Sequence, residues 1–598
     1  MAAYLADPLR RPRQELPWSA CDGQTVLKIL RKNKVPLLSL GQRADGQELL
    51  QSPPFQAAIH AEAEGLAGLR AEYRKVKETL DSEGIAGVMI KSVGLAPSFP
   101  YKSDNLDVLY RPQDVERIRT ILCDLGYVEL RNVEEPHKYL FRKFHAGRSI
   151  SAIHLHAHVG WMVSFLDEKA LWQRCQVSQD DPLVIVPAAE DALLTTLAHY
   201  FYEDKRVALL DVLKFAHCLR RGVNWDEVYR VATWRGWRDG LNVSLLLSAY
   251  QESALYGETL APRPVLEQAW NELPTWARSR LERRLGQVAL DPASFSEERR
   301  RQASETGLQQ LPLRISFVFS KIFFYAKLVR DPTRSTRRKL RDLVIHTGYG
   351  TKLRLHIRSQ PAMLITFSGV DGCGKTSQAQ ALQSAFETCL IRANHVWSRG
   401  GSSSWLGVLS KWSKGHSAPE SDHATQPTAD KVQARQGRFR SPWLRWGWSW
   451  LTALELLWHH CWHVTLPLRL GRVVICDRYV YDAFADWAAY FGEPQVEHRL
   501  AARVLRWLCP RPHVAYWLDT PANVVQSRSA DGLPTSFLDS QSAAYGRFAA
   551  KYGLRRMDGP SDKEDISDHI VYEALTSYFG NYHTLVNQLF LRNPGQWR

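Results

Sequence analysis

At 598 residues the chain is too long for a single small domain, and two to four domains are expected. Its nine cysteines form no C-x-x-C pair, which argues against a zinc module or a disulfide framework and predicts a reducing, cytoplasmic setting. The formal charge of +15 predicts anionic partners, without choosing among nucleotides, nucleic acid and anionic membranes.

Neither a signal peptide nor a membrane-spanning segment is expected. The first 18 residues lack an apolar stretch of signal-peptide length. Residues 446–468 come closest to an apolar run of about 18 residues, but Glu455 and three histidines interrupt them. This stretch predicts a packed amphipathic helix.

The first third of the chain begins with mostly helical patterns, over residues 1–84. Three strand candidates and one further helix follow, at residues 88–93, 105–111 and 150–159 and at residues 114–127. The second strand candidate carries a carboxylate, Asp107. The order of these elements, with a carboxylate on the second strand, is a recognisable arrangement.

This arrangement resembles the polymerase-β-like nucleotidyltransferases. It resembles in particular a family whose sequence runs KG, DIDLLV, a helix ending in LGY and a strand ending in DLHW. The similarity continues through residues 186–228 and covers about 85–250. It implies an α+β nucleotidyltransferase-like domain with a helical extension.

The catalytic part of that family's pattern is altered in this chain. Such enzymes use two carboxylates one residue apart and a third on a neighbouring strand, because two Mg²⁺ ions about 3.5–4 Å apart must be clamped. The three positions hold Asn105, Asp107 and His154, and Lys91 and Ser92 stand in place of the Lys-Gly pair. Asp107 and His154 are the candidate site residues. Nucleotidyl transfer and a substrate-holding or regulatory role both remain open.

His154 and His156 share one face of their predicted strand, because strand side chains alternate. With Asp107 they have the composition of a metal site. The alternative is a set of hydrogen-bonded partners in a half-buried sheet.

Basic residues outnumber acidic ones between residues 330 and 358. Such a segment is able to lie on an anionic membrane surface. The alternative is an interdomain helix with a solvated basic face. Either interpretation places a domain junction here.

Residues 363–376 predict a strand, a glycine-rich turn and a helix, with the pattern G-x-x-x-x-G-K-[ST] set by Gly369, Gly374, Lys375 and Thr376. Glycines let the backbone N–H groups of such a turn surround phosphate oxygens. Lys375 would reach the β- and γ-phosphates, and the Thr376 hydroxyl would hold Mg²⁺. The predicted nucleotide-binding residues are Gly369, Asp371, Gly372, Cys373, Gly374, Lys375, Thr376 and Ser377.

Further strands are predicted within residues 394–401, 471–486 and 513–529, with a polar insert at 402–440 that we expect to be mobile. The middle one is a buried parallel strand that delivers Asp477 and Arg478 at its carboxyl end. Open α/β sheets bind their ligands at that edge.

These segments together resemble thymidylate kinase over most of residues 360–580. GVDGCGKT resembles its phosphate loop, RGG its substrate loop and DRY its signature, and the step from Asp519 to Arg528 resembles the entry to its lid. The resemblance implies a P-loop NTPase domain with a doubly wound parallel sheet. It also implies phosphoryl transfer from ATP with Mg²⁺, in which positioning and charge neutralisation dominate.

The resemblance assigns roles to individual residues. The implied catalytic residues are Lys375, Asp477, Arg478 and Arg528. The implied acceptor contacts are Asp371, Arg399 and Arg478, and the implied Mg²⁺ ligands are Thr376 and Asp477. Asp482 is a further candidate acceptor contact.

Several departures from the kinase pattern leave the acceptor open. Asp482 replaces the serine after DRY, and Asp486-Trp487 replaces the Tyr-Gln pair that helps to seat thymine. The lid segment ADGLPTSF lacks the arginines of bacterial forms. The acceptor is therefore dTMP, a similar nucleotide or another small phosphorylated or hydroxylated molecule.

We expect four regions, namely a helical region at 1–84, a nucleotidyltransferase-like domain at 85–250, a helical basic connector at 251–360 and a kinase-like domain at 361–598. A nucleotide-binding regulatory or scaffold protein with degenerate sites is the competing interpretation. Nucleic acid is not an expected partner, because no recognised nucleic-acid motif occurs. Peripheral membrane contact and homodimer formation remain open.

Overall fold

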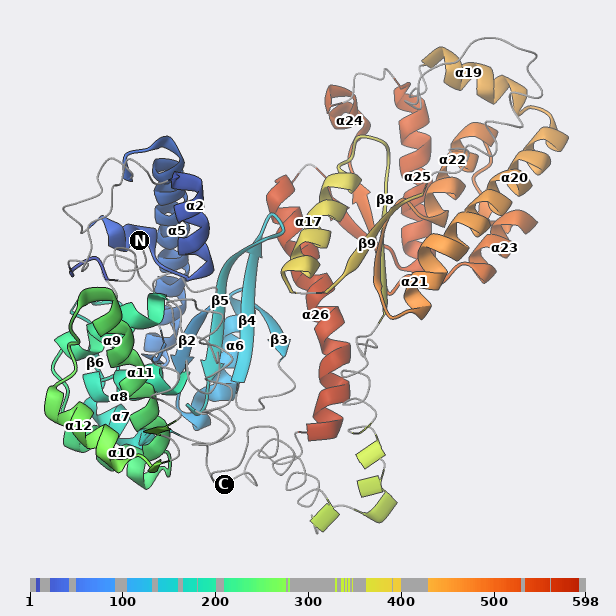
Figure 1. Cartoon of the computed structure of the whole chain (residues 1–598). Coiled ribbons are helices and arrows are strands. Elements are labelled where there is room, and N and C mark those ends of the chain that lie inside the picture. The colour runs from blue at the N-terminus through green and yellow to red at the C-terminus, as the bar shows by residue number, and fades with distance from the viewer. Residues whose placement is uncertain are drawn as a thin grey trace. The chain divides into compact units, whose positions relative to one another are not determined.

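The computed structural model forms two compact units, Met1–Arg142 with Ile150–Leu343 and Lys143–Ser149 with Val344–Arg598 (Figure 1). The described residues are 7–10, 22–41, 50–91, 105–131, 138–159, 165–179, 181–199, 209–275, 278–279, short stretches between 329 and 347, 362–389, 391–398, 429–528, 533–559 and 561–590. Within them, no helix has the combination of length and hydropathy that a bilayer crossing needs. Most of the predicted basic connector lies outside the described residues.

The first unit begins with helices, as the sequence predicts. They are α2 (Gly23–Lys32), α3 (Leu37–Leu40) and α5 (Pro53–Ser82). The Asp22 carboxylate caps α2 by accepting hydrogen bonds from the backbone N–H groups of Gln24 and Thr25. Leu30 and Phe55 belong to one small apolar cluster that joins α2 to α5.

A five-stranded mixed sheet follows. Its strands in spatial order are β1 (Val88–Met89), β2 (Leu106–Leu109), β5 (Arg148–His156), β4 (Lys138–His145) and β3 (Val128–Arg131). The three predicted strands are confirmed, and α6 (Val115–Asp124) confirms the predicted helix. β2 and β5 pair in parallel, while β1 with β2 and β3 with β4 pair antiparallel. The sequence does not predict β4, because KYLFRKFH lacks regular alternation of apolar and polar residues.

The rest of the first unit is mainly helical. Its elements are α7 (Glu168–Arg174), β6 (Gln176–Val177), β7 (Ile185–Val186), α8 (Ala189–Ala198), α9 (Leu209–Arg220), α10 (Trp225–Trp234), α11 (Arg238–Tyr256) and α12 (Arg263–Glu272). Apolar side chains of the sheet and of these helices form one continuous core.

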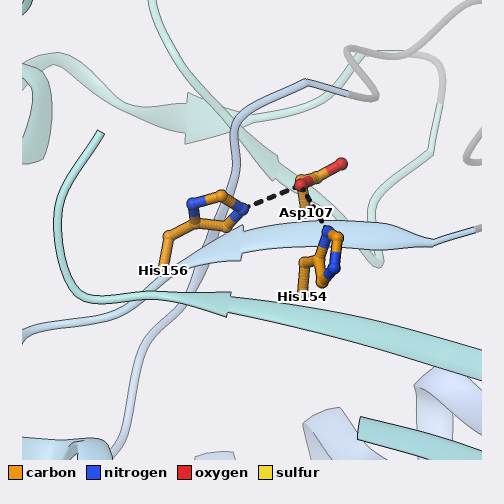
Figure 2. A group of neighbouring side chains, drawn as sticks. All are labelled: Asp107, His154 and His156. Atoms are coloured by element: carbon orange, nitrogen blue, oxygen red, sulfur yellow. Dashed lines mark hydrogen bonds and ion pairs between the residues drawn. The ribbon is translucent and has the colours of Figure 1, made fainter. Parts of the chain in front are cut away.

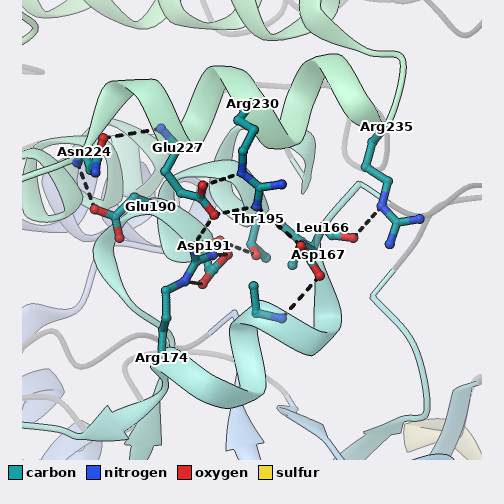
Figure 3. A network of polar contacts seen from close by, with 11 residues as sticks. Leu166, Asp167, Arg174, Glu190, Asp191, Thr195, Asn224, Glu227, Arg230 and Arg235 are labelled. Carbon is teal, nitrogen blue, oxygen red and sulfur yellow. Dashed lines mark hydrogen bonds and ion pairs between the residues drawn. The ribbon is translucent and has the colours of Figure 1, made fainter.

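A network of ion pairs fastens α7 to α8 and α10 (Figure 3). The Arg174 guanidinium donates to Asp191 at 2.7 Å and also pairs with Glu227, which in turn accepts from Arg230. Burial raises the pKa of Asp191 to about 6, although Arg174 opposes this shift. The hydrogen bond from Arg230 lowers the pKa of Glu227 to about 2. These charged groups are therefore occupied by contacts that hold the helices together.

The second unit is built on an all-parallel sheet. Its strands in spatial order are β12 (Arg555–Asp558), β11 (Val514–Asp519), β8 (Met363–Ser368), β10 (Val473–Asp477) and β9 (Ala393–Trp397). Every pair of neighbours in this sheet is parallel. β8 and β10 are buried along their whole length, which explains their continuous apolar sequences. The expected α/β class is confirmed.

Helices cover both faces of this sheet (Figure 1). They are α17 (Lys375–Thr388), α19 (Ala429–Arg438), α20 (Pro442–His460), η4 (Cys461–Thr465), α21 (Leu466–Arg469), α22 (Val480–Phe491), η5 (Val496–His498), α23 (Leu500–Leu508), α24 (Ala522–Arg528), α25 (Thr535–Tyr552) and α26 (Lys563–Phe590). α17 and α26 pack together on one face, and α22 and α25 pack together on the other.

The expectation of a mobile insert over residues 402–440 is wrong for the end of that range. Residues 429–438 form α19, and Phe439 is buried against the rings of Trp448, Tyr490 and Phe491. Among the described side chains of α19, Val432 is buried, and Phe439 is buried directly after the helix. The polar composition of this segment therefore hid its packing from sequence analysis. The earlier residues of the insert lie outside the described part.

Helix α20 confirms the amphipathic helix predicted within 446–468. Its buried residues Ser449, Thr452, Ala453, Leu456 and His460 recur at helical spacing along one face. The His460 ring stacks on Tyr479 at 4.9 Å between centroids, and its nitrogens lie 3.3 Å from Ser398 Oγ and Cys509 Sγ. His460 thus joins α20 to the edge of the sheet.

Acid should weaken the second unit through His460. Burial lowers the pKa of this imidazole from 6.5 to about 3. Below pH 6.5 the unfolded chain therefore binds a proton that the folded chain does not, and stability falls by about 1.4 kcal/mol per pH unit. The His460→Gln variant lacks this imidazole and escapes the loss. As the pH falls from 6.5 to 5, we therefore expect its free energy of unfolding to rise by about 2 kcal/mol relative to that of wild type. Urea unfolding at both pH values measures this, and a constant difference would contradict it.

Candidate functional site

The loop between β8 and α17 depends on glycine. Gly369, Gly372 and Gly374 have φ values of 151°, 85° and 97°, which side chains rarely tolerate. A Cβ on Gly369 would also lie 2.7 Å from the carbonyl oxygen of Leu518 and 2.8 Å from Cys373 Sγ. The backbone of this loop therefore requires glycine at these three positions.

Lys375 lies at the centre of this loop. Its ammonium is buried and donates hydrogen bonds of 2.8 Å to the carbonyl oxygens of Gly369 and Val370. It also lies 3.7 Å from the Asp371 carboxylate. The loop thus wraps around one positive charge.

A second positive charge meets the same carboxylate. Arg478, the residue after β10, pairs with Asp371 through its guanidinium. Its φ of 77° places a residue other than glycine in the left-handed region, and its Nε is buried without a hydrogen-bond partner among the described residues. Two cations therefore converge on Asp371, whose side chain is about one-third exposed at 32%.

The side chains expected to hold Mg²⁺ also meet. The Thr376 hydroxyl donates a hydrogen bond to Asp477 Oδ2. Asp477 is buried, and its Oδ1 has no hydrogen-bond partner among the described residues. Hydroxyl and carboxylate oxygens are the ligands that Mg²⁺ prefers, so this pair fits the metal.

Asp482 lies directly behind the loop. Its carboxylate accepts hydrogen bonds from Ser368 Oγ at 2.7 Å, from the Tyr479 backbone N–H at 2.9 Å and from the Tyr545 hydroxyl at 2.8 Å. The contact with Tyr479 also caps helix α22. These donors give Asp482 a role in positioning the loop, beside the acceptor contact predicted for it.

A cavity opens beside this cluster. Its empty space amounts to about 560 Å³, a figure that includes space open to solvent. The residues that line it are Ser398, Arg435, Trp448, Thr452, Leu456, Arg478, Tyr479, Asp482, Ala483, Asp486, Trp487 and Tyr490. Of the predicted acceptor contacts, Arg478 and Asp482 belong to this lining.

Sequence reasoning missed Arg435, the second guanidinium of the cavity. It comes from α19 and stacks on Trp448 and Tyr490, with its guanidinium carbon 4.8 Å and 4.9 Å from the ring centroids. A basic residue seven positions before an aromatic-rich helix was the only signal, and the polar composition around it obscured that signal.

The remaining predicted residues are placed only in part. Cys373 is buried 3.7 Å from the Lys375 ammonium, and burial raises the pKa of its thiol. Ser377 lies in the first turn of α17. Arg528 ends α24, and its side chain and the whole of Arg399 lie outside the described part.

A second cluster lies in the first unit, where Asp107, His154 and His156 share one face of the sheet (Figure 2). The parallel register sets Asp107 beside His154. Asp107 Oδ1 lies 2.7 Å from His156 Nε2, 3.2 Å from His154 Nδ1 and 3.5 Å from Lys91 Nζ. Burial raises the pKa of Asp107, but Lys91 and the two histidines outweigh burial and hold it well below its usual range.

This cluster does not match a two-Mg²⁺ site. Asn105 and His154 stand where carboxylates are needed, and Arg142 donates to Asn105 at 3.4 Å. Three possible ligand atoms lie within 4.8 Å of one another, so the cluster is able to hold one imidazole-preferring metal. Lys91 already balances the carboxylate charge. The hydrogen-bonded interpretation of the histidines therefore matches the contacts observed.

Removing the Asp107 charge should destabilise the first unit. Asp107→Asn would remove the charge of a buried carboxylate that faces the Lys91 ammonium and two imidazoles, and breaking such a buried pair costs about 3–5 kcal/mol. Asp81→Asn, which breaks the partly exposed pair with Lys77, should cost less than about 1 kcal/mol. Urea unfolding of both variants measures the difference. Equal effects would show that the Asp107 cluster does not support the fold.

Two comparisons with known proteins bear on these sites. Residues 19–250 match the model of a family described as "Uncharacterised nucleotidyltransferase". The match begins within the helical region, before the strands that carry the resemblance. It supports the nucleotidyltransferase-like interpretation of this part of the chain.

The chain is also similar to a curated enzyme, the thymidylate kinase of Psychrobacter sp. (strain PRwf-1). The identity is 27% over 124 residues. The similarity covers 19% of this chain and 60% of that kinase, so the chain spans less than two thirds of the length of this relative. Together the two comparisons point to nucleotide-related transfer chemistry.

Proposed function

We propose that residues 361–598 form a P-loop kinase that transfers a phosphoryl group from ATP, with Mg²⁺, to a small acceptor. The observation that carries this proposal is the convergence of Lys375 and Arg478 on Asp371, beside the Thr376–Asp477 pair. All five side chains lie at the carboxyl edge of the parallel sheet, where such sheets bind ligands. The similarity to a thymidylate kinase supports the same class of reaction.

The residues at this edge have different roles in the proposed reaction. Bound ATP and Mg²⁺ supply the phosphoryl group and neutralise its charge. Lys375 and the loop N–H groups would bind phosphate oxygens, while Thr376 and Asp477 would hold the metal. The Asp371 carboxylate, held between two cations, occupies a place suited to an anion, so an arriving phosphate would compete with it for Arg478.

Two features of the cavity support a phosphorylated acceptor with a flat ring. Two guanidinium groups, those of Arg435 and Arg478, suit an acceptor that already carries a phosphate. The rings of Trp448 and Tyr490 suit a flat group such as a nucleobase. We therefore rank nucleoside monophosphates, dTMP among them, ahead of acceptors without a phosphate.

For the first unit we propose a nucleotide-holding or regulatory role. The family match supports nucleotide chemistry, but Asn105 and His154 remove the carboxylates that two-metal transfer needs. The same two residues favour the competing function, in which the whole chain binds nucleotides without turning them over.

One experiment separates these functions. The full chain is incubated with ATP and Mg²⁺ and with a panel of nucleoside monophosphates and sugar phosphates, and ADP release is followed. We expect release to depend on one nucleoside monophosphate. ATP binding detected by calorimetry, without ADP release for any acceptor, would favour the regulatory function. If the chain neither binds ATP nor releases ADP, both functions are contradicted.

A further inference from the structure

The cavity beside the glycine loop lies between two antiparallel helices, α20 and α22. His460, the last residue of α20, stacks on Tyr479, which directly precedes α22. Trp448, in the first half of α20, and Tyr490, near the end of α22, instead share a contact with Arg435. The cavity therefore has two distinct ends, a loop end at Tyr479 and a far end at Arg435.

The loop end suits the phosphate of an acceptor. Arg478 directly precedes Tyr479 and pairs with Asp371 of the glycine loop. Asp486 lies seven residues after Tyr479, and an α-helix rises about 10 Å over that many residues. This is roughly the span from the phosphate of a mononucleotide to the far edge of its base. A nucleotide whose phosphate is bound by Arg478 would therefore bring its base to Asp486 and Arg435.

Asp486 presents a hydrogen-bond acceptor to such a base. Its side chain lines the cavity, and its Oδ1 accepts a hydrogen bond of 2.7 Å from the Gln541 amide, which orients the carboxylate. A carboxylate has about four acceptor positions, so Asp486 is able to bind a ligand as well as Gln541. Asp482, the other carboxylate of the lining, holds the loop through Ser368 instead. Asp486 is therefore the carboxylate that the base would meet.

Arg435 brings hydrogen-bond donors to the same end. Its guanidinium contacts the rings of Trp448 and Tyr490, and no carboxylate in the described part of the chain forms an ion pair with it. A guanidinium only donates hydrogen bonds, whereas an ionised carboxylate only accepts them. The far end thus combines one donor group and one acceptor group with aromatic rings, on which a base is able to stack.

We propose that the acceptor is a guanine nucleotide, GMP or dGMP, whose base is bound by Asp486 and Arg435. This assignment rests on the kinase function proposed above. Guanine carries adjacent N–H donors at N1 and N2, which match the two oxygens of one carboxylate. Its O6 and N7 atoms accept two hydrogen bonds from one guanidinium.

The other bases fit this pair of side chains less well. Thymine and uracil have a single N–H donor in the ring, flanked by two carbonyl oxygens that a carboxylate repels. Adenine and cytosine place a ring-nitrogen acceptor beside their amino group, so only one oxygen of Asp486 would find a donor. Asp486 therefore favours guanine over the other four bases.

The base preference is measured on the full chain by ADP release with ATP, Mg²⁺ and each of GMP, dGMP, AMP, CMP, UMP and dTMP. We expect kcat/KM for GMP or dGMP to exceed that for dTMP by about 10–100-fold, the discrimination typical of one bidentate base contact. Turnover that is fastest with any other base would overturn the assignment.

Asp486→Asn tests the role of the carboxylate. The variant keeps an acceptor for Gln541 but replaces one oxygen with an amide donor, which is able to pair with a carbonyl oxygen of thymine beside its N–H. The ratio of kcat/KM for GMP to that for dTMP should therefore fall by about tenfold or more. Asp539→Asn, at an exposed position of α25, is the matched control and should leave this ratio within twofold of wild type. An unchanged ratio in a folded Asp486→Asn variant would overturn the proposal.

Binding distinguishes failure of the base assignment from failure of the kinase function. Calorimetry of the wild-type chain with GMP and with dTMP, in the presence of a non-hydrolysable ATP analogue, requires no turnover. Tighter binding of GMP without ADP release for any acceptor would support the base assignment and contradict the kinase function. ADP release together with tighter binding of dTMP would support the kinase function and overturn the base assignment. If neither nucleotide binds, the base assignment is overturned as well.

Discussion

Lys375→Ala is expected to lower phosphoryl transfer by about 10³-fold or more, because losing one charge that stabilises transferring phosphate costs several kcal/mol. The Lys375 ammonium is buried within the glycine loop and lies between the loop carbonyls and Asp371. No neighbouring side chain on the loop supplies a replacement charge. ADP release under saturating ATP and the best acceptor measures the effect.

The same substitution removes a donor from two buried carbonyl oxygens, so the fold must be checked separately. Circular dichroism and the melting temperature of the variant report whether the sheet remains folded. Lys551→Ala is the matched control, because Lys551 forms a partly exposed pair with Glu497, 3.1 Å away. It should change turnover less than twofold. A folded Lys375→Ala variant with wild-type turnover would contradict the proposed nucleotide site.

Local patterns explain why much of the second unit could be predicted. The glycine turn, the strand before it and the helix after it follow from residues 363–376 alone, because each residue type there has one strong backbone preference. The strand that ends at Asp477 is apolar throughout and could be recognised as buried and parallel. Once both strands belong to one parallel sheet, their carboxyl ends must lie at one edge, which brings Asp477 to Thr376.

Contacts between distant segments explain what could not be predicted. Arg435 reaches the cavity through α19, whose polar sequence carries almost no apolar periodicity. The hydrogen bonds that Asp482 accepts come from β8 and α25, and no local pattern records them. In the first unit, alternation predicted that His154 and His156 share a face, but the position of Lys91 beside Asp107 depends on the pairing of β1 with β2.

Arg478→Gly and Arg478→Ala should both abolish most turnover yet differ in stability. Either change removes the guanidinium that pairs with Asp371 and lines the cavity, which should lower turnover by about 10³-fold. The backbone at Arg478 is left-handed, a conformation that costs a residue with a Cβ about 1–2 kcal/mol. The glycine variant should therefore be more stable than the alanine variant by about 1 kcal/mol, the reverse of the usual order.

The comparison needs a site with ordinary backbone angles. Gln383 lies within α17, where alanine should exceed glycine in stability by about 1 kcal/mol. Urea unfolding of the two pairs of variants should therefore give differences of opposite sign. If glycine is the less stable choice at both positions, the left-handed backbone at Arg478 stores no strain. If the order reverses only at Arg478, the chain maintains an unfavourable backbone to present this guanidinium beside Lys375, as a binding site for a charged ligand requires.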